Sequence, residues 1–314
     1  MPSSEADSTT MAWKPPKDLV SYFTHALKSY QLSNATFRVL CSLPSSSPQL
    51  SQVLPKRLLV LDSSFNPPTL AHQQMALSAF SEHEHSDKND DKSRVLLLLA
   101  INNADKAPKP AAFPQRLAMM YIFAQDLLAS ASASASQTTT PRASACEGVD
   151  IAVTTEPYFH AKSRAVASCD SYLKPGPEPE PVEQVYLTGF DTLIRIFDPK
   201  YYPDGSMARA LDPFFAHARL RVSTRTDAEW GDEREQLAYL DGLRAGALEQ
   251  VGGRTGWAER IDLVKGQGGG AEVVSSTKVR GAVLRGDWDA LEKLVSGGVA
   301  GWIRRQGLYA EAGA

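Results

Sequence analysis

The sequence predicts an α/β protein in which helices cover a mostly parallel, doubly wound sheet. Two observations indicate this fold class. Short apolar runs of strand length alternate with segments of helical periodicity along the chain. Two of these runs end in hydroxyl-rich turns that lead directly into a helix, as at the ligand-binding edge of such sheets. The 314 residues can hold one large domain of this kind or two small ones, and they contain no internal repeat.

The composition is typical of a soluble globular protein, with 43% hydrophobic and 22% charged residues. A net charge of −3 gives no indication of a general nucleic-acid binder. The three cysteines lie far apart without metal-ligand or redox spacing, which favours a reducing compartment. The longest apolar run, 95–101, is too short to span a membrane, and the polar N-terminus does not resemble a signal peptide. We therefore expect a cytoplasmic or nuclear protein.

The chain is expected to form one α/β domain over residues 17–310, after a disordered N-terminus over 1–16. Flexible insertions are expected near 81–93, 129–148 and 173–183, where the composition becomes polar, Ala/Ser-repetitive and Pro/Glu-rich, respectively. The first insertion contains a His-x-His pair. Because Asp, Lys and Ser surround it, we interpret this pair as part of a solvated loop and not as a metal site.

The regular elements follow from apolar spacing and from capping residues. A helix is expected from Asp18, as an N-terminal extension, and an additional strand over 37–42. Further strands are expected at 94–101, 150–154, 185–188, 219–223 and 261–264, with helices from Pro114, over 161–168 and over about 229–249.

The central stretch is a strand from Arg57 to Asp62 that reads as buried on both faces. The pattern breaks at Ser63, and the prolines of 66–68 prevent a helix before Thr69. Thr69 is a good N-cap, so His72 is expected in the first turn of a helix that follows the carboxyl end of a parallel strand. Free N–H groups at such a helix start favour phosphate. A lone histidine on a helix is usually only a surface group, but this context favours a ligand site.

A second strand-to-helix transition is expected at 272–286. The strand 272–274 leads into Ser275, Ser276 and Thr277, which can cap the helix. Arg280 lies one turn further on, where its guanidinium can reach an anion held by the backbone amides. Taken alone, this pattern fits a capped surface helix at least as well.

Together the two stretches resemble the motifs of the nicotinamide mononucleotide (NMN) adenylyltransferase family, within the nucleotidyltransferase superfamily. The first motif is Gly-Ser-Phe-Asn-Pro-x-Thr-x-x-His, and residues 63–72 differ from it by Ser63 in place of glycine. The second is Ile-Ser-Ser-Thr-x-x-Arg, and residues 274–280 differ from it by Val274. The resemblance covers 58–309 in outline and is greatest to divergent fungal-type members.

The resemblance implies the Rossmann-like nucleotidyltransferase fold and adenylyl transfer from ATP to NMN, which gives NAD and pyrophosphate. The catalytic residues it implies are His72, Thr69 and Arg280, which would stabilise charge in the transition state. The ATP- and NMN-binding residues it implies are Ser63, Ser64, Phe65, Lys106, Gly189, Asp191, Tyr201, Tyr202, Arg225, Ser276, Thr277 and Lys278. No dedicated metal ligands are implied, and Mg²⁺ is expected to be carried by ATP.

Two alternatives remain open. The protein could transfer a nucleotidyl group to another phosphorylated acceptor, because Ser63 and the pair Tyr201-Tyr202, where the family has Leu-Trp, depart from the family pattern. It could instead be a nucleotide-binding regulatory protein with little transfer activity, against which the intact His72 and Arg280 argue. The choice between NMN and nicotinic acid mononucleotide, the oligomeric state and any protein partner are left open.

Overall fold

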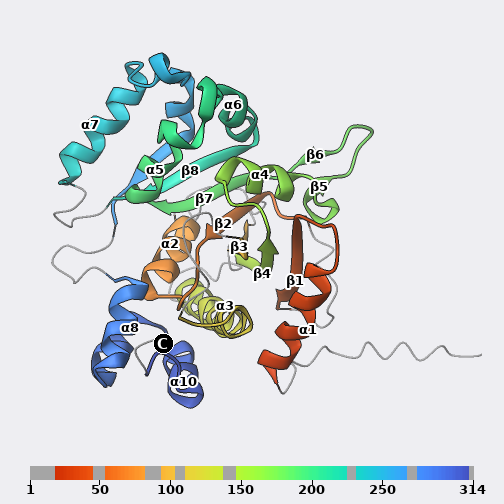
Figure 1. The fold of residues 1–314 in the computed structure, drawn as a ribbon, viewed down its shortest axis with the longest axis vertical. Helices are drawn as coiled ribbons and strands as arrows, with labels where there is room; N and C mark the ends of the chain where they lie inside the picture. The colour runs from red at the N-terminus through yellow and green to blue at the C-terminus, as the bar shows by residue number, and fades with distance from the viewer. Residues whose placement is uncertain are drawn as a thin grey trace, which may run out of the picture.

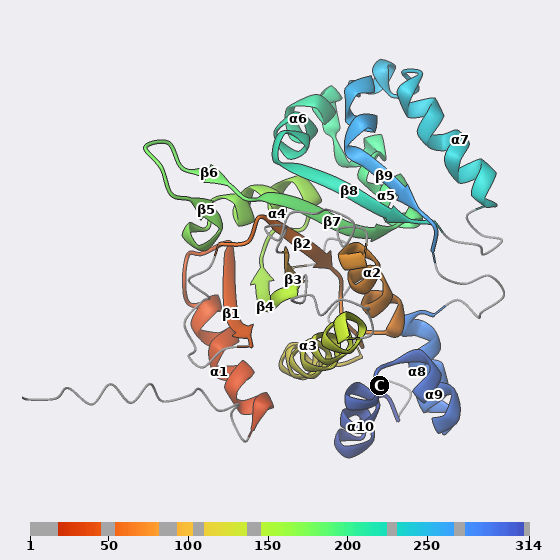
Figure 2. The same cartoon turned by 180° about the vertical axis from the view of Figure 1, so that it is seen from behind.

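One sheet of seven strands runs through the molecule, with helices on both of its faces (Figures 1 and 2). The structure is a computed structural model that describes residues 18–44, 54–81, 93–102, 110–136, 146–224, 231–266 and 274–310. None of the described helices combines the length and the hydrophobicity needed to cross a membrane.

The strand order is β1-β4-β3-β2-β7-β8-β9. The strands are β1 (Phe37–Leu43), β2 (Arg57–Asp62), β3 (Ser93–Ala100), β4 (Cys146–Thr154), β7 (Glu183–Gly189), β8 (Ala218–Ser223) and β9 (Ile261–Val264). β1 pairs antiparallel with β4, and the other neighbouring strands pair in parallel. The expected mostly parallel α/β sheet is confirmed.

The sheet is doubly wound around β2. From β2 the chain adds β3 and β4 on one side, and then returns to add β7, β8 and β9 on the other. The winding direction therefore reverses between β2 and β7, which pair with Leu59 opposite Val185. In open α/β sheets, ligands bind outside the carboxyl ends of the strands at this reversal.

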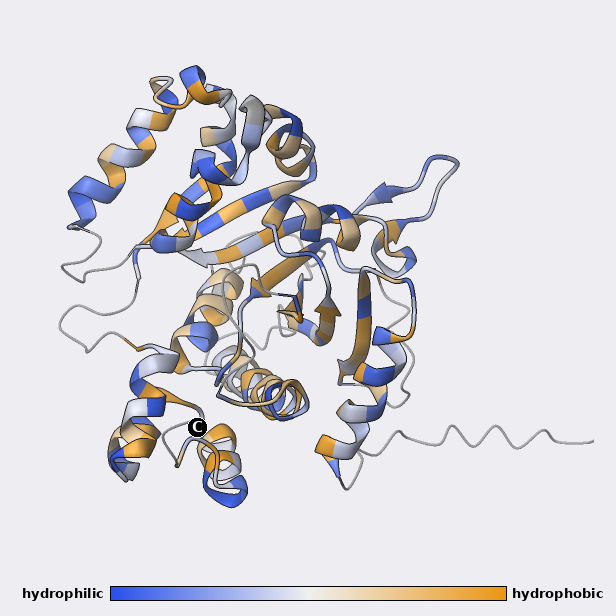
Figure 3. Ribbon diagram, in the orientation of Figure 1, coloured by the Kyte–Doolittle hydropathy of each residue, from blue (hydrophilic) through white to orange (hydrophobic). Residues whose placement is uncertain are grey.

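β2 is buried on both faces, as its sequence predicts. Leu59 and Leu61 belong to one hydrophobic core, whereas Leu58 and Val60 belong to the other. A strand that contributes to two cores has no polar face, so its apolar residues run without alternation. Figure 3 shows the hydrophobic colouring concentrated along these central strands.

The helices form two layers. Against the core of Leu59 pack α1 (Leu19–Gln31), α2 (Leu70–Ser81), α3 (Phe113–Ser136), α8 (Ser276–Leu284), α9 (Trp288–Leu294) and α10 (Gly297–Gln306). Against the core of Leu58 pack α4 (Phe159–Ala167), α5 (Phe190–Ile196), α6 (Met207–His217) and α7 (Glu233–Arg244). Short 3₁₀ turns connect them: η1 (Asp170–Tyr172), η2 (Pro199–Tyr201), η3 (Pro203–Gly205), η4 (Glu249–Val251) and η5 (Thr255–Arg260).

The structure differs from expectation in the insertion expected at 129–148. Helix α3 continues through the Ala/Ser run to Ser136, and β4 already begins at Cys146. Alanine is the best helix former, and the hydroxyls of Ser130 and Ser134 donate to the carbonyl four residues earlier without leaving the helix. The run is therefore helical over its described part. Residues 137–145 lie outside the described residues.

The other expected elements are found with shifted bounds. The N-terminal helix begins after its Asp18 cap, and β1 covers the expected edge strand. The helix expected over 229–249 is the shorter α7, which starts with a capping box between Asp232 and Glu235. The insertion expected at 173–183 contains a small hairpin of β5 (Leu173–Lys174) and β6 (Glu180–Pro181). Residues 1–17 and 82–92, and Glu272 and Val273 of the expected last strand, lie outside the described residues.

Candidate active site

The turn between β2 and α2 is held by its buried middle residue. The N–H of Ser63 donates to Leu98 O (3.3 Å), which extends the pairing of β2 with β3 by one residue. Phe65 is fully buried and has a φ of +43°, in the left-handed region that residues other than glycine rarely adopt. Its ring lies against the imidazole of His72, with the centroids 5.3 Å apart. Ser64, just before it, is exposed at the carboxyl edge of the sheet.

The hydrogen bonds of His72 determine where its proton lies. The N–H of Thr69 donates to Nδ1 of His72 (3.0 Å), and Thr69 Oγ1 lies 2.8 Å from the same nitrogen. Because a backbone N–H can only donate, Nδ1 is the acceptor, and the neutral ring carries its proton on Nε2. Nε2 lies 3.0 Å from Oγ of Ser63, so it donates to that hydroxyl. The serine that replaces the family's glycine thus contacts the histidine directly.

Burial keeps the His72 ring uncharged. It lowers the pKa of His72 from 6.5 to about 4, because the imidazolium would lose its hydration among protein atoms. At neutral pH the side chain is therefore a neutral hydrogen-bond donor through Nε2. Its position in the first turn of α2 is the one that the sequence predicts.

The second motif forms the start of α8. Ser275 is the N-cap, and its Oγ accepts a hydrogen bond from the N–H of Lys278 (3.3 Å). Ser276, Thr277 and Lys278 make up the first turn, so their amides lie at the positive end of the helix dipole. This arrangement matches the sequence-based expectation.

Two hydrogen bonds connect α8 to the β2–α2 turn, and a third within α8 orients Arg280. The hydroxyl of Ser276 donates to Pro67 O (2.8 Å), and Nη1 of Arg280 donates to Asn66 O (2.8 Å). The other terminal nitrogen of Arg280 donates to Thr277 Oγ1 (3.1 Å). Arg280 and Asn66 are 214 residues apart in the sequence. The two motifs are thus joined in one site, where the beginnings of α2 and α8 adjoin.

A second guanidinium reaches the same turn from α3. Arg116 is 5% exposed; its Nε donates to Ala111 O (2.8 Å), and Nη1 lies 3.5 Å from Ser64 O. Its guanidinium also stacks over the ring of Phe113 at 5.1 Å. Burial lowers the pKa of Arg116, and the nearby charge of Arg280 lowers it further, yet an arginine stays protonated at neutral pH. Two cations and two helix starts therefore converge on one turn, which favours a bound anion.

Aromatic rings gather on the other side of the switch point. Gly189 ends β7 and caps α5, which places Asp191 in the first turn of that helix. The rings of Tyr201 and Tyr158 lie 6.0 Å apart, and Tyr158 stacks on His160 at 5.7 Å.

Tyr202 is oriented differently from its neighbour. Its side chain is buried, and its hydroxyl donates to Ile196 O (2.6 Å). Of the two predicted tyrosines, the half-buried Tyr201 is therefore the better placed to meet a ligand. The remaining predicted ligands, Lys106 and Arg225, lie outside the described residues.

The sequence analysis did not assign a role to Tyr309. This residue is 9% exposed, and its hydroxyl donates to Asn66 Oδ1 (2.8 Å) in the β2–α2 turn. Tyr309 follows α10, so no local turn or capping pattern in the sequence marks it as part of this site.

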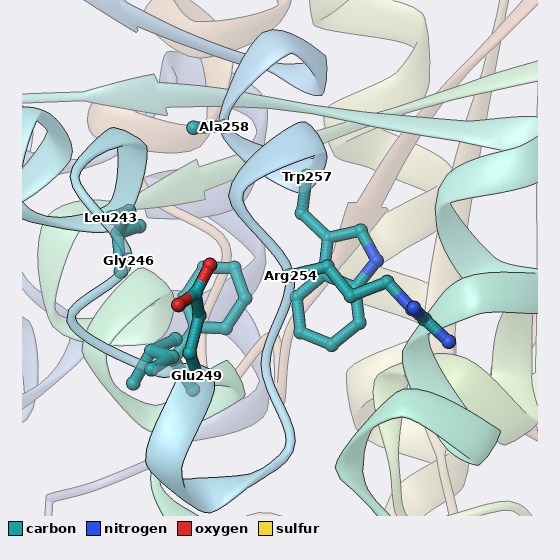
Figure 4. Close-up of a pocket in the computed structure, with 8 residues that line it drawn as sticks. Leu243, Gly246, Glu249, Arg254, Trp257 and Ala258 are labelled. Carbon is teal, nitrogen blue, oxygen red and sulfur yellow. The ribbon is translucent and has the colours of Figure 1, made fainter.

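The pocket in Figure 4 lies elsewhere. Its lining includes Leu243, Glu249, Arg254 and Trp257. Trp257 lies in η5, which precedes β9, so the pocket opens at the amino-terminal edge of the sheet. It is therefore separate from the site at the carboxyl edge.

Taken together, a doubly wound sheet whose switch point is flanked by two helix starts and two guanidinium groups defines an α/β protein that binds phosphorylated nucleotides. The sequence is 35% identical over 244 residues to a curated Schizosaccharomyces pombe protein that is named, provisionally, as a nicotinamide mononucleotide adenylyltransferase. The match covers 78% of this chain and 82% of that protein. The chain belongs to the nicotinamide mononucleotide adenylyltransferase family. No model of a known protein family matches it.

Two solved structures show a partial similarity to this one. A Plasmodium falciparum nicotinic acid mononucleotide adenylyltransferase complexed with NaAD has a TM-score of 0.43 at 12% identity, covering 81% of this chain and 97% of that one. Thermotoga maritima TmcAL bound with alpha-thio ATP has a TM-score of 0.36 at 12% identity, covering 80% of this chain and 56% of that one. Both TM-scores lie below 0.5.

Proposed function

We propose that this protein transfers the adenylyl group of ATP to nicotinamide mononucleotide, giving NAD and pyrophosphate. The reaction is the one indicated by the name of the S. pombe relative. The observation that supports it most is the convergence of His72, Arg116 and Arg280 on the turn between β2 and α2. This is the edge where open α/β sheets bind ligands.

The reaction needs no nucleophile from the protein. An oxygen of the NMN phosphate attacks the α-phosphorus of ATP, the bond from that phosphorus to the β-phosphate oxygen breaks, and pyrophosphate leaves. The protein contributes positioning and stabilisation of negative charge. A set of neutral and cationic hydrogen-bond donors without a general base is suited to this task.

His72 would donate a hydrogen bond from Nε2 to an α-phosphoryl oxygen, exchanging Ser63 Oγ for the ligand. Thr69 keeps the proton on Nε2 by donating to Nδ1. The ring is uncharged, so it gives a directed hydrogen bond without itself drawing phosphate at long range. The cationic side chains of the site would therefore attract the triphosphate.

The start of α8 would hold the β- and γ-phosphates through its amides and through Thr277, Lys278 and Arg280. Arg280 is kept in place for this by its bond to Asn66 O. Within the described part of the chain, no group of three or more His, Cys, Asp or Glu side chains lies together as a metal site. We propose that Mg²⁺ enters as the Mg–ATP complex.

The acceptor would lie toward β7 and the aromatic rings. Ser64 and Phe65 would offer backbone amides to its phosphate and Ser63 its hydroxyl, with Lys106 as a further cation. Gly189 and Asp191 would contact ribose hydroxyls, because a carboxylate can accept two hydrogen bonds from a diol. Tyr201 would stack on the base, and the buried Tyr202 would support Tyr201 from the protein interior.

The test is product formation from ATP, Mg²⁺ and NMN, with nicotinic acid mononucleotide and other phosphorylated acceptors assayed in parallel. We expect NAD and pyrophosphate in equal amounts, and no pyrophosphate when the acceptor is omitted. If only another acceptor received the adenylyl group, the proposed site would stand but NMN would not be the substrate. The Tyr201-Tyr202 pair, which replaces the family's Leu-Trp, is the reason to test this alternative. Binding of ATP without transfer to any acceptor would instead identify a nucleotide-binding regulatory protein.

A further inference from the structure

An ion pair joins helix α4 to the last residue of β2. The ammonium nitrogen of Lys162 lies 2.6 Å from Oδ2 of Asp62, and the two side chains are only 7% and 5% exposed. Lys162 thereby reaches from the α4 layer to the carboxyl end of the central strand. Neither residue belongs to the two sequence motifs.

Stability alone is a weak reason for this pair. Removing a lysine and a carboxylate from water costs about as much as their attraction returns, so a hydrophobic pair often serves equally well. A comparable pair, Arg94 and Asp150, lies 2.7 Å apart with 3% and 1% exposure. Arg94 is opposite Leu58 at the start of β2, whereas Asp62 ends that strand. The two pairs thus match in burial but lie toward opposite ends of the sheet.

The Lys162–Asp62 pair borders the proposed phosphate site. Asp62 is followed directly by Ser63, whose hydroxyl contacts His72 Nε2 at 3.0 Å. A carboxylate without a counter-ion at this point would repel the phosphates that the turn attracts. Charges act on each other more strongly here than in bulk water, because the surroundings are largely protein.

We propose that Lys162 is a positioning residue for the phosphate-binding turn. It holds the carboxylate of Asp62 in place and cancels its negative charge, so that polyanionic nucleotides can bind beside Ser63 and Ser64. Lys162 acts through Asp62 and not by touching the substrate. The inference rests on the proposed function for the identity of the nucleotides, but the binding of Mg–ATP tests it without turnover.

The experiment compares Lys162→Met, Asp62→Asn and the double variant by calorimetric titration with Mg–ATP, alongside KM values for ATP and NMN. We expect Lys162→Met to raise the Kd and both KM values about tenfold or more, because Asp62 is left uncompensated. The double variant should return to within about threefold of wild type, because neither charge remains. Lys162→Arg, which keeps the charge, should also rescue binding.

Arg94→Met is the matched control. It leaves another buried carboxylate uncompensated, so its thermal midpoint should fall as in Lys162→Met, while its Kd for Mg–ATP should stay within twofold of wild type. A purely structural role for Lys162 predicts the same behaviour for both variants.

The proposal is overturned if folded Lys162→Met binds Mg–ATP within twofold of wild type, or if the double variant binds no better than Lys162→Met. If Lys162→Met does not fold, the Kd values of Asp62→Asn and of the double variant test the proposal. A tenfold rise in Kd for Asp62→Asn or for the double variant would then contradict the proposal, because neither carries a carboxylate to repel phosphate. Failure of the proposed function is a separate result, namely wild-type protein that binds Mg–ATP but forms no NAD.

Discussion

At the scale of single residues, the state of His72 depends on Thr69. The backbone N–H of Thr69 occupies Nδ1, and burial disfavours the imidazolium, so the ring presents one N–H toward the turn. A group of this kind stabilises charge as it develops on a phosphoryl oxygen and transfers no proton. Two predictions follow from this arrangement.

Replacing His72 with alanine should lower kcat for adenylyl transfer about 100-fold or more, because the loss of one donor to a transition-state oxygen typically costs this much. The Kd for Mg–ATP should change far less, since the cations are intact. Initial rates of NAD formation measure the effect. His25→Ala on the exposed face of α1 is the control and should be as active as wild type. A rate within threefold of wild type for His72→Ala would rule out the assigned role.

His72 should also make folding stability depend on pH. Its pKa is about 4 in the folded protein and near 6.5 in the unfolded chain. Between these values the unfolded chain binds more protons, so the contribution is complete above pH 6.5 and is lost as the pH falls toward 4. Thermal midpoints at pH 7 and pH 5 should therefore differ more for wild type than for His72→Gln. Equal differences would contradict a buried, neutral histidine.

At the scale of elements, two helix starts create the anion site. α2 begins after the turn of β2, and α8 begins at the Ser275 cap, where Ser276 also bonds to Pro67 O. The capping of α8 should therefore affect both stability and ligand binding.

Ser275→Ala should lower the free energy of unfolding by about 1 kcal/mol, because the N–H of Lys278 loses its capping acceptor. It should also raise the KM for ATP several-fold, because the amides of this turn face the proposed phosphates. Asp287→Ala is the matched control, since Asp287 caps α9 by accepting from the N–H of Ala290 (3.0 Å). That variant should lose similar stability with an unchanged KM. Equal KM values for ATP in Ser275→Ala and Asp287→Ala would show that the start of α8 does not contact the nucleotide.

The sequence predicts the elements best where one interaction dominates. Buried strands such as β2 and β3 are visible because parallel strands need continuous apolar runs. α6 has helical spacing at Met207, Leu211 and Phe214, but Pro213 inside it obscures the pattern. α5 follows Gly189 with no side-chain cap, so no local signal marks its start.

The candidate site divides in the same way. His72 and Arg280 are predictable, because local turn and cap chemistry surrounds each of them. Arg116, Lys162 and Tyr309 reach the turn only through packing of α3, α4 and the segment after α10. Contacts of this kind depend on the sheet order, which no single stretch of sequence encodes.

At the scale of the whole molecule, the segment after α10 packs against the β2–α2 turn of the site. Tyr309 bonds to Asn66 across 243 residues of sequence, while Arg280 holds the carbonyl of the same residue. α10 packs against α3, so this segment is held in a fixed position beside the central turn.

Tyr309→Phe should lower the free energy of unfolding by about 1 kcal/mol, because Asn66 Oδ1 loses one buried donor. It should also raise the KM for ATP, because the turn that orients Arg280 is less constrained. Chemical denaturation and initial rates measure the two effects. Tyr22→Phe, which removes a hydroxyl bond to Leu40 O (3.2 Å) at α1, should lose comparable stability at an unchanged KM. Equal KM values for ATP in Tyr309→Phe and Tyr22→Phe would contradict a role of Tyr309 in orienting Arg280.

The position of α8 at the far end of the strand sequence has a consequence for synthesis. A growing chain has all seven strands of the sheet once Val264 has left the ribosome, whereas a domain generally folds as a unit. The donors of α8 and the hydroxyl of Tyr309 are still missing at that stage. Because α8, α9 and α10 also cover the core of Leu59, a chain that stops after β9 would lack both part of that core and the donors of the proposed phosphate site. Docking of the last helices would therefore complete the fold and the nucleotide site together.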